Sequence, residues 1–139
     1  MEKYVHTVHY YETDRMGITH HSNYIRWMEE ARVYYLNKNG CGYADVEKLG
    51  FSSPVLGIEC SYKKTTTFDD EVEVEIRLAE YNGVKMSYEY TMKNKTTGEV
   101  AFVGKSSHCF INSEGRPINL KKAMPEIDEK LSKLYNIDN

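Results

Sequence analysis

Two stretches of strictly alternating residues constrain this chain of 139 residues most strongly. Residues 71–81 read EVEVEIRLAEY, with apolar side chains at alternate positions and mostly charged ones between them. A period of two is typical of a β-strand that has one face buried and one face in water. After Asn82-Gly83, a pair typical of type I′ hairpins, residues 84–92 alternate in the same way. The chain therefore contains an antiparallel sheet whose apolar face needs a cover.

The one long helical pattern of the sequence can provide that cover. Ser22 or Asn23 is a suitable N-cap, and Asn39-Gly40 is a suitable end. Between them, large apolar residues recur at the spacing of one helix face, so that face must be buried. The residues of this stripe are Tyr24, Trp27, Met28, Ala31 and Tyr35.

The remaining segments complete an α+β pattern. Shorter helices are expected over residues 44–49 and 124–135. Further strands are expected over residues 4–11, 55–65 with a bulge near Gly57, and 99–111. The order of one strand, one long helix and then at least four antiparallel strands predicts a sheet wrapped around a central helix.

Composition narrows the class of protein. A chain of 139 residues suits one domain, here 1–139, because two would each bury too little apolar surface. No run approaches the roughly 20 apolar residues of a membrane helix, and we expect no membrane association. The N-terminus lacks a signal-peptide pattern and the three cysteines are not paired in spacing, so a cytoplasmic location is expected. A net charge of −3 argues against a nucleic-acid partner.

The segment from Tyr10 to Arg32, YYETDRMGITHHSNYIRWMEEAR, carries the residues best suited to chemistry. It contains T-D-x-x-G, a histidine seven residues after the aspartate, N-Y two residues later, and E-x-A-R in the helix. This combination resembles the 4-hydroxybenzoyl-CoA thioesterase family of hotdog-fold acyl-CoA hydrolases. Residues 108–120, HCFINSEGRPINL, are similar to the last strand and turn of that family. The resemblance thus covers nearly the whole chain.

The resemblance implies a thioesterase site around Asp14. A carboxylate that is ionised at neutral pH can attack a thioester or activate water. Backbone N–H groups near Asn23 and Tyr24, at the start of the helix, would hold the carbonyl oxygen. Gly17 of the same motif is also assigned to substrate binding. The alternative for Asp14 is a turn residue that only hydrogen-bonds its own loop.

Other residues of the predicted site have supporting parts. His21 would orient water, contact the thioester or assist the leaving thiolate, or else only cap or pack. Tyr10 would hydrogen-bond the Asp14 carboxylate or line an acyl pocket, or else pack in the core. Lys63 and Lys64 are candidates for the CoA phosphates, with Lys121-Lys122 as the second choice, unless they are ordinary surface lysines.

A metal site is disfavoured by the sequence. Four histidines and Asp14 lie near one another in the sequence, but His6 and His9 on a strand would face opposite sides, and adjacent His20 and His21 would diverge. A Ser22-His21-Asp14 triad is also disfavoured, because no G-x-S-x-G elbow is present. We therefore expect neither a metal nor another cofactor.

Three functions remain open at this point. The preferred one is hydrolysis of an acyl-CoA, or of an acyl carrier protein thioester, by a homodimer or homotetramer with sites at the subunit interface, as the resemblance implies. A hydratase or dehydratase of the same fold is the second, since a fold does not determine a reaction. A non-catalytic protein that binds acyl thioesters is the third.

Overall fold

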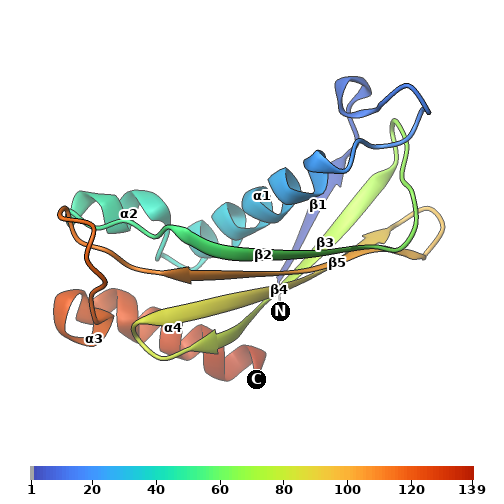
Figure 1. The fold of residues 1–139 in the computed structure, drawn as a ribbon. Helices are drawn as coiled ribbons and strands as arrows, with labels where there is room; N and C mark the ends of the chain where they lie inside the picture. Colours follow the sequence, from blue (N-terminus) through green and yellow to red (C-terminus); the bar gives the residue numbers. More distant parts are fainter. Residues whose placement is uncertain (1) are drawn as a thin grey trace.

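The computed structural model describes residues 2–139 and contains one five-stranded antiparallel sheet in the order β1-β3-β4-β5-β2 (Figure 1). The strands are β1 Glu2–Thr7, β2 Val55–Tyr62, β3 Glu71–Tyr81, β4 Lys85–Asn94 and β5 Val100–Cys109. The helices are η1 Tyr10–Glu12, a 3₁₀ turn, then α1 Ser22–Lys38, α2 Tyr43–Lys48, α3 Leu120–Ala123 and α4 Pro125–Asp138. The predicted α+β arrangement is confirmed.

Helix α1 lies along the sheet, and the predicted apolar stripe is its buried face (Figure 1). All five stripe residues are buried, and four alternate residues of β3 are completely so: Val72, Val74, Ile76 and Leu78. Helix α4 packs against the end of β3, where Asp138 accepts hydrogen bonds from the Leu78 N–H (2.9 Å) and the Tyr35 hydroxyl (2.6 Å). One hydrophobic core therefore joins the helices to the sheet.

A polar chain crosses this core beneath α1. The buried Arg32 guanidinium donates to the Tyr90 hydroxyl at 3.0 Å, and that oxygen lies 2.6 Å from Ser106 Oγ. Ser106 Oγ in turn lies 2.8 Å from Nε2 of the fully buried His108. The other ring nitrogen of His108, Nδ1, has no hydrogen-bond partner among the described residues.

Three local predictions are wrong. The first strand ends at Thr7 rather than at residue 11, because the chain turns into η1. Neither Ser22 nor Asn23 is the N-cap of α1, which is His21 without a side-chain capping bond within residues 2–139; Asn23 instead donates to the carbonyl oxygens of Glu12 and His20. Asn82 does not have the positive φ of a type I′ turn, and its side chain accepts the N–H groups of Val84 and Lys85. The predicted bulge near Gly57 is confirmed.

The helices of residues 2–139 include none that is both long and apolar enough to span a membrane.

Candidate active site

Asp14 lies in a tight turn between β1 and α1. Its Oδ1 accepts the Met16 N–H at 2.8 Å, and its backbone oxygen accepts the Gly17 N–H at 3.0 Å. Gly17 has φ +78°, a conformation that favours glycine, and this explains the glycine of the motif. Within residues 2–139, no hydrogen bond to Asp14 Oδ2 is found. The turn therefore orients the carboxylate and leaves one oxygen available.

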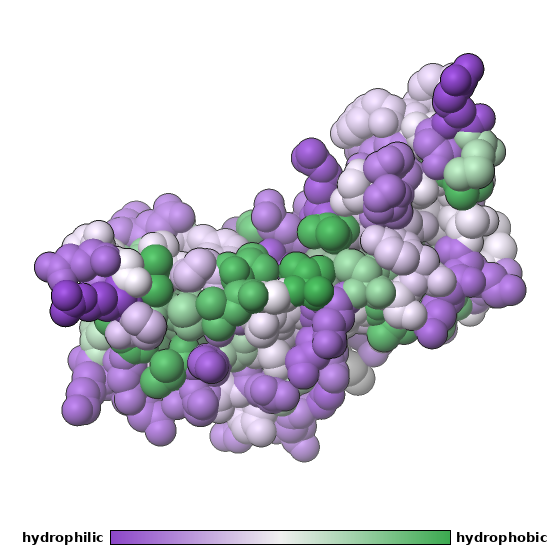
Figure 2. All heavy atoms as spheres, in the orientation of Figure 1, coloured by the Kyte–Doolittle hydropathy of each residue, from purple (hydrophilic) through white to green (hydrophobic). Residues whose placement is uncertain are grey.

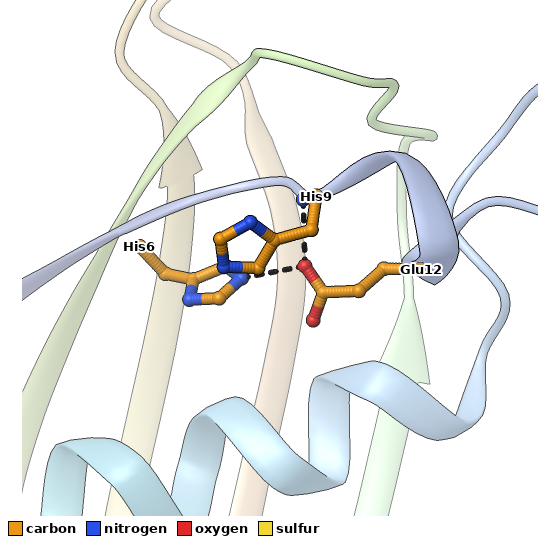
Figure 3. Close-up of side chains that lie close together, drawn as sticks. All are labelled: His6, His9 and Glu12. Atoms are coloured by element: carbon orange, nitrogen blue, oxygen red, sulfur yellow. Dashed lines mark hydrogen bonds and ion pairs between the residues drawn. The ribbon is translucent and has the colours of Figure 1, made fainter.

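Glu12 anchors this turn to the core, a role that the sequence analysis missed. It is 4% exposed, and its Oε1 lies 2.7 Å from His6 Nε2 and accepts the His9 N–H at 2.8 Å (Figure 3). Its Oε2 accepts the indole N–H of Trp27 at 2.8 Å. Burial opposes ionisation of the carboxyl, but these hydrogen bonds outweigh burial and lower the pKa of Glu12.

No sequence signal distinguishes Glu12 from an ordinary turn acid. Its burial depends on Trp27, which lies 15 residues away and contacts it only after α1 has folded back over β1. Glu12 also holds the start of α1, because its backbone oxygen accepts the His20 N–H and the Asn23 side chain. Asp14 thus lies two residues after Glu12, whose side chain is held in the core and whose backbone oxygen is bonded to the start of α1.

His20 and His21 lie together at the start of α1. Their rings stack with centroids 4.3 Å apart, so the prediction that they diverge is wrong. His20 Nδ1 lies 2.8 Å from Ser22 Oγ, and the His21 carbonyl accepts the Tyr62 hydroxyl at 3.2 Å. The His21 ring itself is exposed and available to a ligand.

The argument that His6 and His9 face opposite sides is also wrong. Because β1 ends at Thr7, the two rings are not held to strand alternation, and their centroids lie 5.3 Å apart. Figure 3 shows both rings beside the Glu12 carboxylate, above α1.

The predicted site residues line two hollows near the start of α1. One, of about 580 Å³, is bordered by Asp14 and Asn23 together with Glu12, His20 and Arg26. The other, of about 410 Å³, is bordered by His21, Tyr24, Lys63 and Lys64, with Tyr62 among its other residues. Asp14 and His21 therefore do not line the same hollow.

Two predicted residues line neither hollow. Tyr10 is 76% exposed and its ring contacts Phe68, so it is neither a core residue nor a partner of the Asp14 carboxylate. Gly17 acts through the backbone of the turn.

Tyr24 has a largely structural side chain. It is buried, its ring stacks on Phe102 at 5.2 Å, and its hydroxyl lies 2.9 Å from Thr66 Oγ1. Burial raises the pKa of Tyr24 despite these hydroxyl contacts. The part of Tyr24 that can bind a ligand is its backbone N–H, because an N–H in the first turn of a helix has no acceptor inside the helix.

The neighbouring N–H groups at this end of α1 are already engaged. The Asn23 N–H donates to the His20 carbonyl at 3.0 Å, and the Ser22 N–H donates to His20 Nδ1 at 3.2 Å. Of the two amides named from the sequence, Tyr24 is thus the better donor to a ligand.

The sequence matches the thioesterase-like superfamily over residues 8–133. A Bacillus subtilis (strain 168) protein provisionally named an acyl-CoA thioesterase is 40% identical over 120 residues, which are 86% of each chain. A provisionally named esterase of Aquifex aeolicus (strain VF5) is 32% identical over 124 residues, 89% of this chain and 94% of the other.

The solved structures agree with this match. A DHNA-CoA thioesterase from Staphylococcus aureus superimposes with a TM-score of 0.92 and 34% identity, covering 99% of this chain and 92% of the other. A Staphylococcus aureus protein solved in complex with CoA has the same fold, with a TM-score of 0.88 and 15% identity. The chain belongs to the thioesterase-like superfamily and has its hotdog fold.

Proposed function

We propose that the protein hydrolyses an acyl-CoA, in which water and R–CO–S–CoA give the free acid and CoA–SH. The names of the relatives support this class of reaction, since acyl-CoA thioesterases and a DHNA-CoA thioesterase are among them. These names do not single out 4-hydroxybenzoyl-CoA. An acyl carrier protein thioester is the alternative substrate.

Asp14 is the proposed nucleophile or general base. The single observation that carries this role is its half-engaged carboxylate, in which Oδ1 is held by the Met16 N–H and Oδ2 has no hydrogen bond within residues 2–139. As a base, Oδ2 takes a proton from the water that attacks the carbonyl carbon. As a nucleophile, it attacks that carbon itself and expels the CoA thiolate, and water then cleaves the mixed anhydride.

The first turn of α1 is the proposed position of the thioester carbonyl. The Tyr24 N–H lies at the positive end of the helix dipole, where it stabilises the oxyanion that forms during attack. The Asn23 side chain donates hydrogen bonds to the Glu12 and His20 carbonyl oxygens, so its role is to position the loop before α1. His21, beside the same turn, has the supporting role of contacting the thioester or the leaving thiolate.

The two hollows suggest a site that a second subunit completes. Asp14 lines one and His21 the other, so a ligand that meets both must pass across the start of α1. We propose a homodimer or homotetramer in which a partner subunit covers this surface, with Lys63 and Lys64 facing the CoA phosphates.

The test is Asp14→Asn, which keeps the shape of the side chain and removes its charge. We expect kcat for acyl-CoA to fall at least about 100-fold with KM nearly unchanged, as for loss of a reacting group. His21→Ala should cost about tenfold, as for a supporting group. Thiol release over short, long and aromatic acyl-CoAs is the assay, and it also identifies the acyl group.

Asp69→Asn is the matched control. Asp69 is exposed in another turn, and asparagine tolerates its positive φ of 69°, so activity should not change. An Asp14→Asn variant with most of its activity would remove Asp14 from the mechanism. An enoyl product without thiol release would identify a hydratase or dehydratase, and tight binding without turnover would identify a binding protein.

A further inference from the structure

His6, His9 and Glu12 form a cluster that the thioesterase reaction does not use. One ligand atom from each lies within 4.8 Å of the others (Figure 3). His6 lies at the end of β1, and Glu12 closes the η1 turn that follows it. Two imidazoles and a carboxylate are a ligand set that proteins use for zinc, with water at the fourth position.

His6 lies between two carboxylates. Its Nε2 lies 2.7 Å from Glu12 Oε1, and its Nδ1 lies 3.2 Å from Glu30 Oε2. A neutral imidazole carries only one N–H, so it can donate to only one of these carboxylates. The hydrogen bond of the ring is the one between Nε2 and Glu12, so a metal ion at this position would displace the Nε2 proton and have the Nε2 lone pair and Glu12 Oε1 as ligands.

Other groups lie behind the cluster at positions where groups that orient metal ligands are found. Histidine ligands usually have a carboxylate beside their second ring nitrogen, and Glu30 Oε2 lies 3.2 Å from His6 Nδ1. Ligating carboxylates are themselves hydrogen-bonded, and Glu12 Oε2 accepts the Trp27 indole N–H. The His6 ring also lies against Trp27, with centroids 4.6 Å apart, which restricts its rotation.

His9 is the exposed member of the cluster, and its ring is the ligand that has to move. Its side chain is exposed, whereas His6 and Glu12 are buried. In residues 2–139 the ring nitrogens of His9 make no hydrogen bond, although the ring stacks on Tyr11 at 5.1 Å. Ligands around zinc are about 3.4 Å apart, as follows from Zn–N distances near 2.1 Å in a tetrahedron. The His9 ring therefore has to swing inward to bind.

We propose that His6, His9 and Glu12 bind a divalent transition-metal ion, with zinc as the best fit. The ion takes the place of the proton between His6 and Glu12 and ties the end of β1 to η1. Since Asp14 comes two residues after Glu12, the ion would also stiffen the loop that carries the proposed catalytic carboxylate. The site does not depend on the thioesterase proposal, because it is detected by metal binding alone.

The experiment is calorimetric titration of ZnCl₂ into untagged full-length protein that has been stripped with a chelator. We expect one ion per chain and a rise in Tm when the ion is bound, because a ligand of the folded state stabilises it. Visible absorption of the Co²⁺ form should show tetrahedral coordination. Glu30→Gln should weaken binding about 10-fold or more, the usual cost of losing a group that orients a ligand.

His9→Ala and His20→Ala are the matched pair of variants. Both remove an exposed histidine, but His20 stacks on His21 outside the cluster. His9→Ala should cost at least the 10–100-fold expected for an orienting group, while His20→Ala should leave the affinity unchanged. The reverse pattern would assign binding to the His20-His21 pair and overturn the proposal. A Kd weaker than about 100 μM in the unsubstituted protein would show that a proton alone fills the position.

Discussion

At the scale of single residues, Glu12 and Asp14 are two positions apart and differ in how their oxygens are used. Both oxygens of Glu12 are engaged in the core, by His6, the His9 N–H and Trp27. Asp14 is half-buried and has one oxygen held by its own turn. A carboxylate with satisfied oxygens stabilises structure, whereas one with a free oxygen can accept a proton or attack carbon. Glu12 therefore belongs to the scaffold, and Asp14 is the acid that we propose for the chemistry.

His108 makes stability depend on pH. Burial, assisted by the positive charge of Arg32, lowers the pKa of His108 from 6.5 to about 4. Between pH 6.5 and about 4, His108 is therefore protonated in the unfolded state and neutral in the folded state. The contribution of the neutral ring is complete above pH 6.5 and is lost as pH falls toward 4. From pH 7 to pH 5 we expect the free energy of unfolding to decrease by roughly 2 kcal/mol.

Urea unfolding at several pH values between 7 and 5 measures this effect, and His108→Gln is the control. Glutamine does not titrate, so the variant should lose most of the slope even if it is less stable overall. The pH range of the measurement stays above 4.5, the ordinary pKa of glutamate. Because the pKa of Glu12 is lowered in the folded state, its contribution to stability is lost only below pH 4.5 and does not affect this range. Equal slopes in the two proteins would contradict the assignment to His108.

At the scale of elements, the hydrophobic periodicity of the sequence predicted the strand and the helix that each bury one apolar face. The alternation of residues 71–81 matches β3 Glu71–Tyr81, and the helical stripe is the buried face of α1. Both patterns extend over many residues and depend on one apolar face meeting another. The T-D-x-x-G motif likewise located the turn of Asp14.

The predictions from sequence were wrong where contacts of single side chains, rather than the local residue pattern, determine the backbone conformation. The η1 turn follows β1 because the Glu12 side chain returns to the His9 N–H, and that acid is held by Trp27 of α1. Asn82 hydrogen-bonds the loop with its side chain instead of adopting a positive φ. Neither the burial of Glu12 nor the meeting of His6 and His9 could be read from residue spacing.

The end of β2 is the element at which we expect CoA phosphates to bind. Lys63 and Lys64 follow Tyr62 and line the hollow of His21, although Lys64 also lies 3.7 Å from Glu99. Each exposed charge contributes about 1 kcal/mol near a phosphate, so reversing two charges should raise KM for acyl-CoA about tenfold or more. For Lys63→Glu/Lys64→Glu, kcat should change little, because the phosphates are bound equally in the ground and transition states.

Two controls accompany this measurement. Hydrolysis of a short thioester without the nucleotide should be unaffected, and added salt should reduce the difference between the two substrates. Lys121→Glu/Lys122→Glu makes the same change in α3. An increase in KM for that variant alone would move the phosphate site to α3.

At the scale of the whole molecule, the sheet ends in an edge that is unprotected. The strand order leaves β2 with only β5 as a neighbour, and nearly all of its residues are exposed. Figure 2 shows an apolar band across the face where β2 lies in Figure 1. Val55, Leu56 and the neighbouring Val103 are exposed on these strands. Such an edge commonly pairs with another chain, and two-fold pairing of β2 with a second copy would cover both the band and its free backbone groups.

We therefore predict that Leu56→Glu weakens the association of subunits and reduces activity, because the interface would bury an unpaired charge. A cost of about 3 kcal/mol corresponds to a Kd raised about 100-fold. Leu49→Glu in the turn after α2 is the matched control, since Leu49 is 56% exposed and Leu56 is 53% exposed. Sedimentation at assay concentration should show a dimer or tetramer for the unsubstituted protein and for Leu49→Glu, and a larger monomer fraction for Leu56→Glu. Far-UV circular dichroism separates dissociation from unfolding, and a fully active monomer would show that one chain completes the site alone.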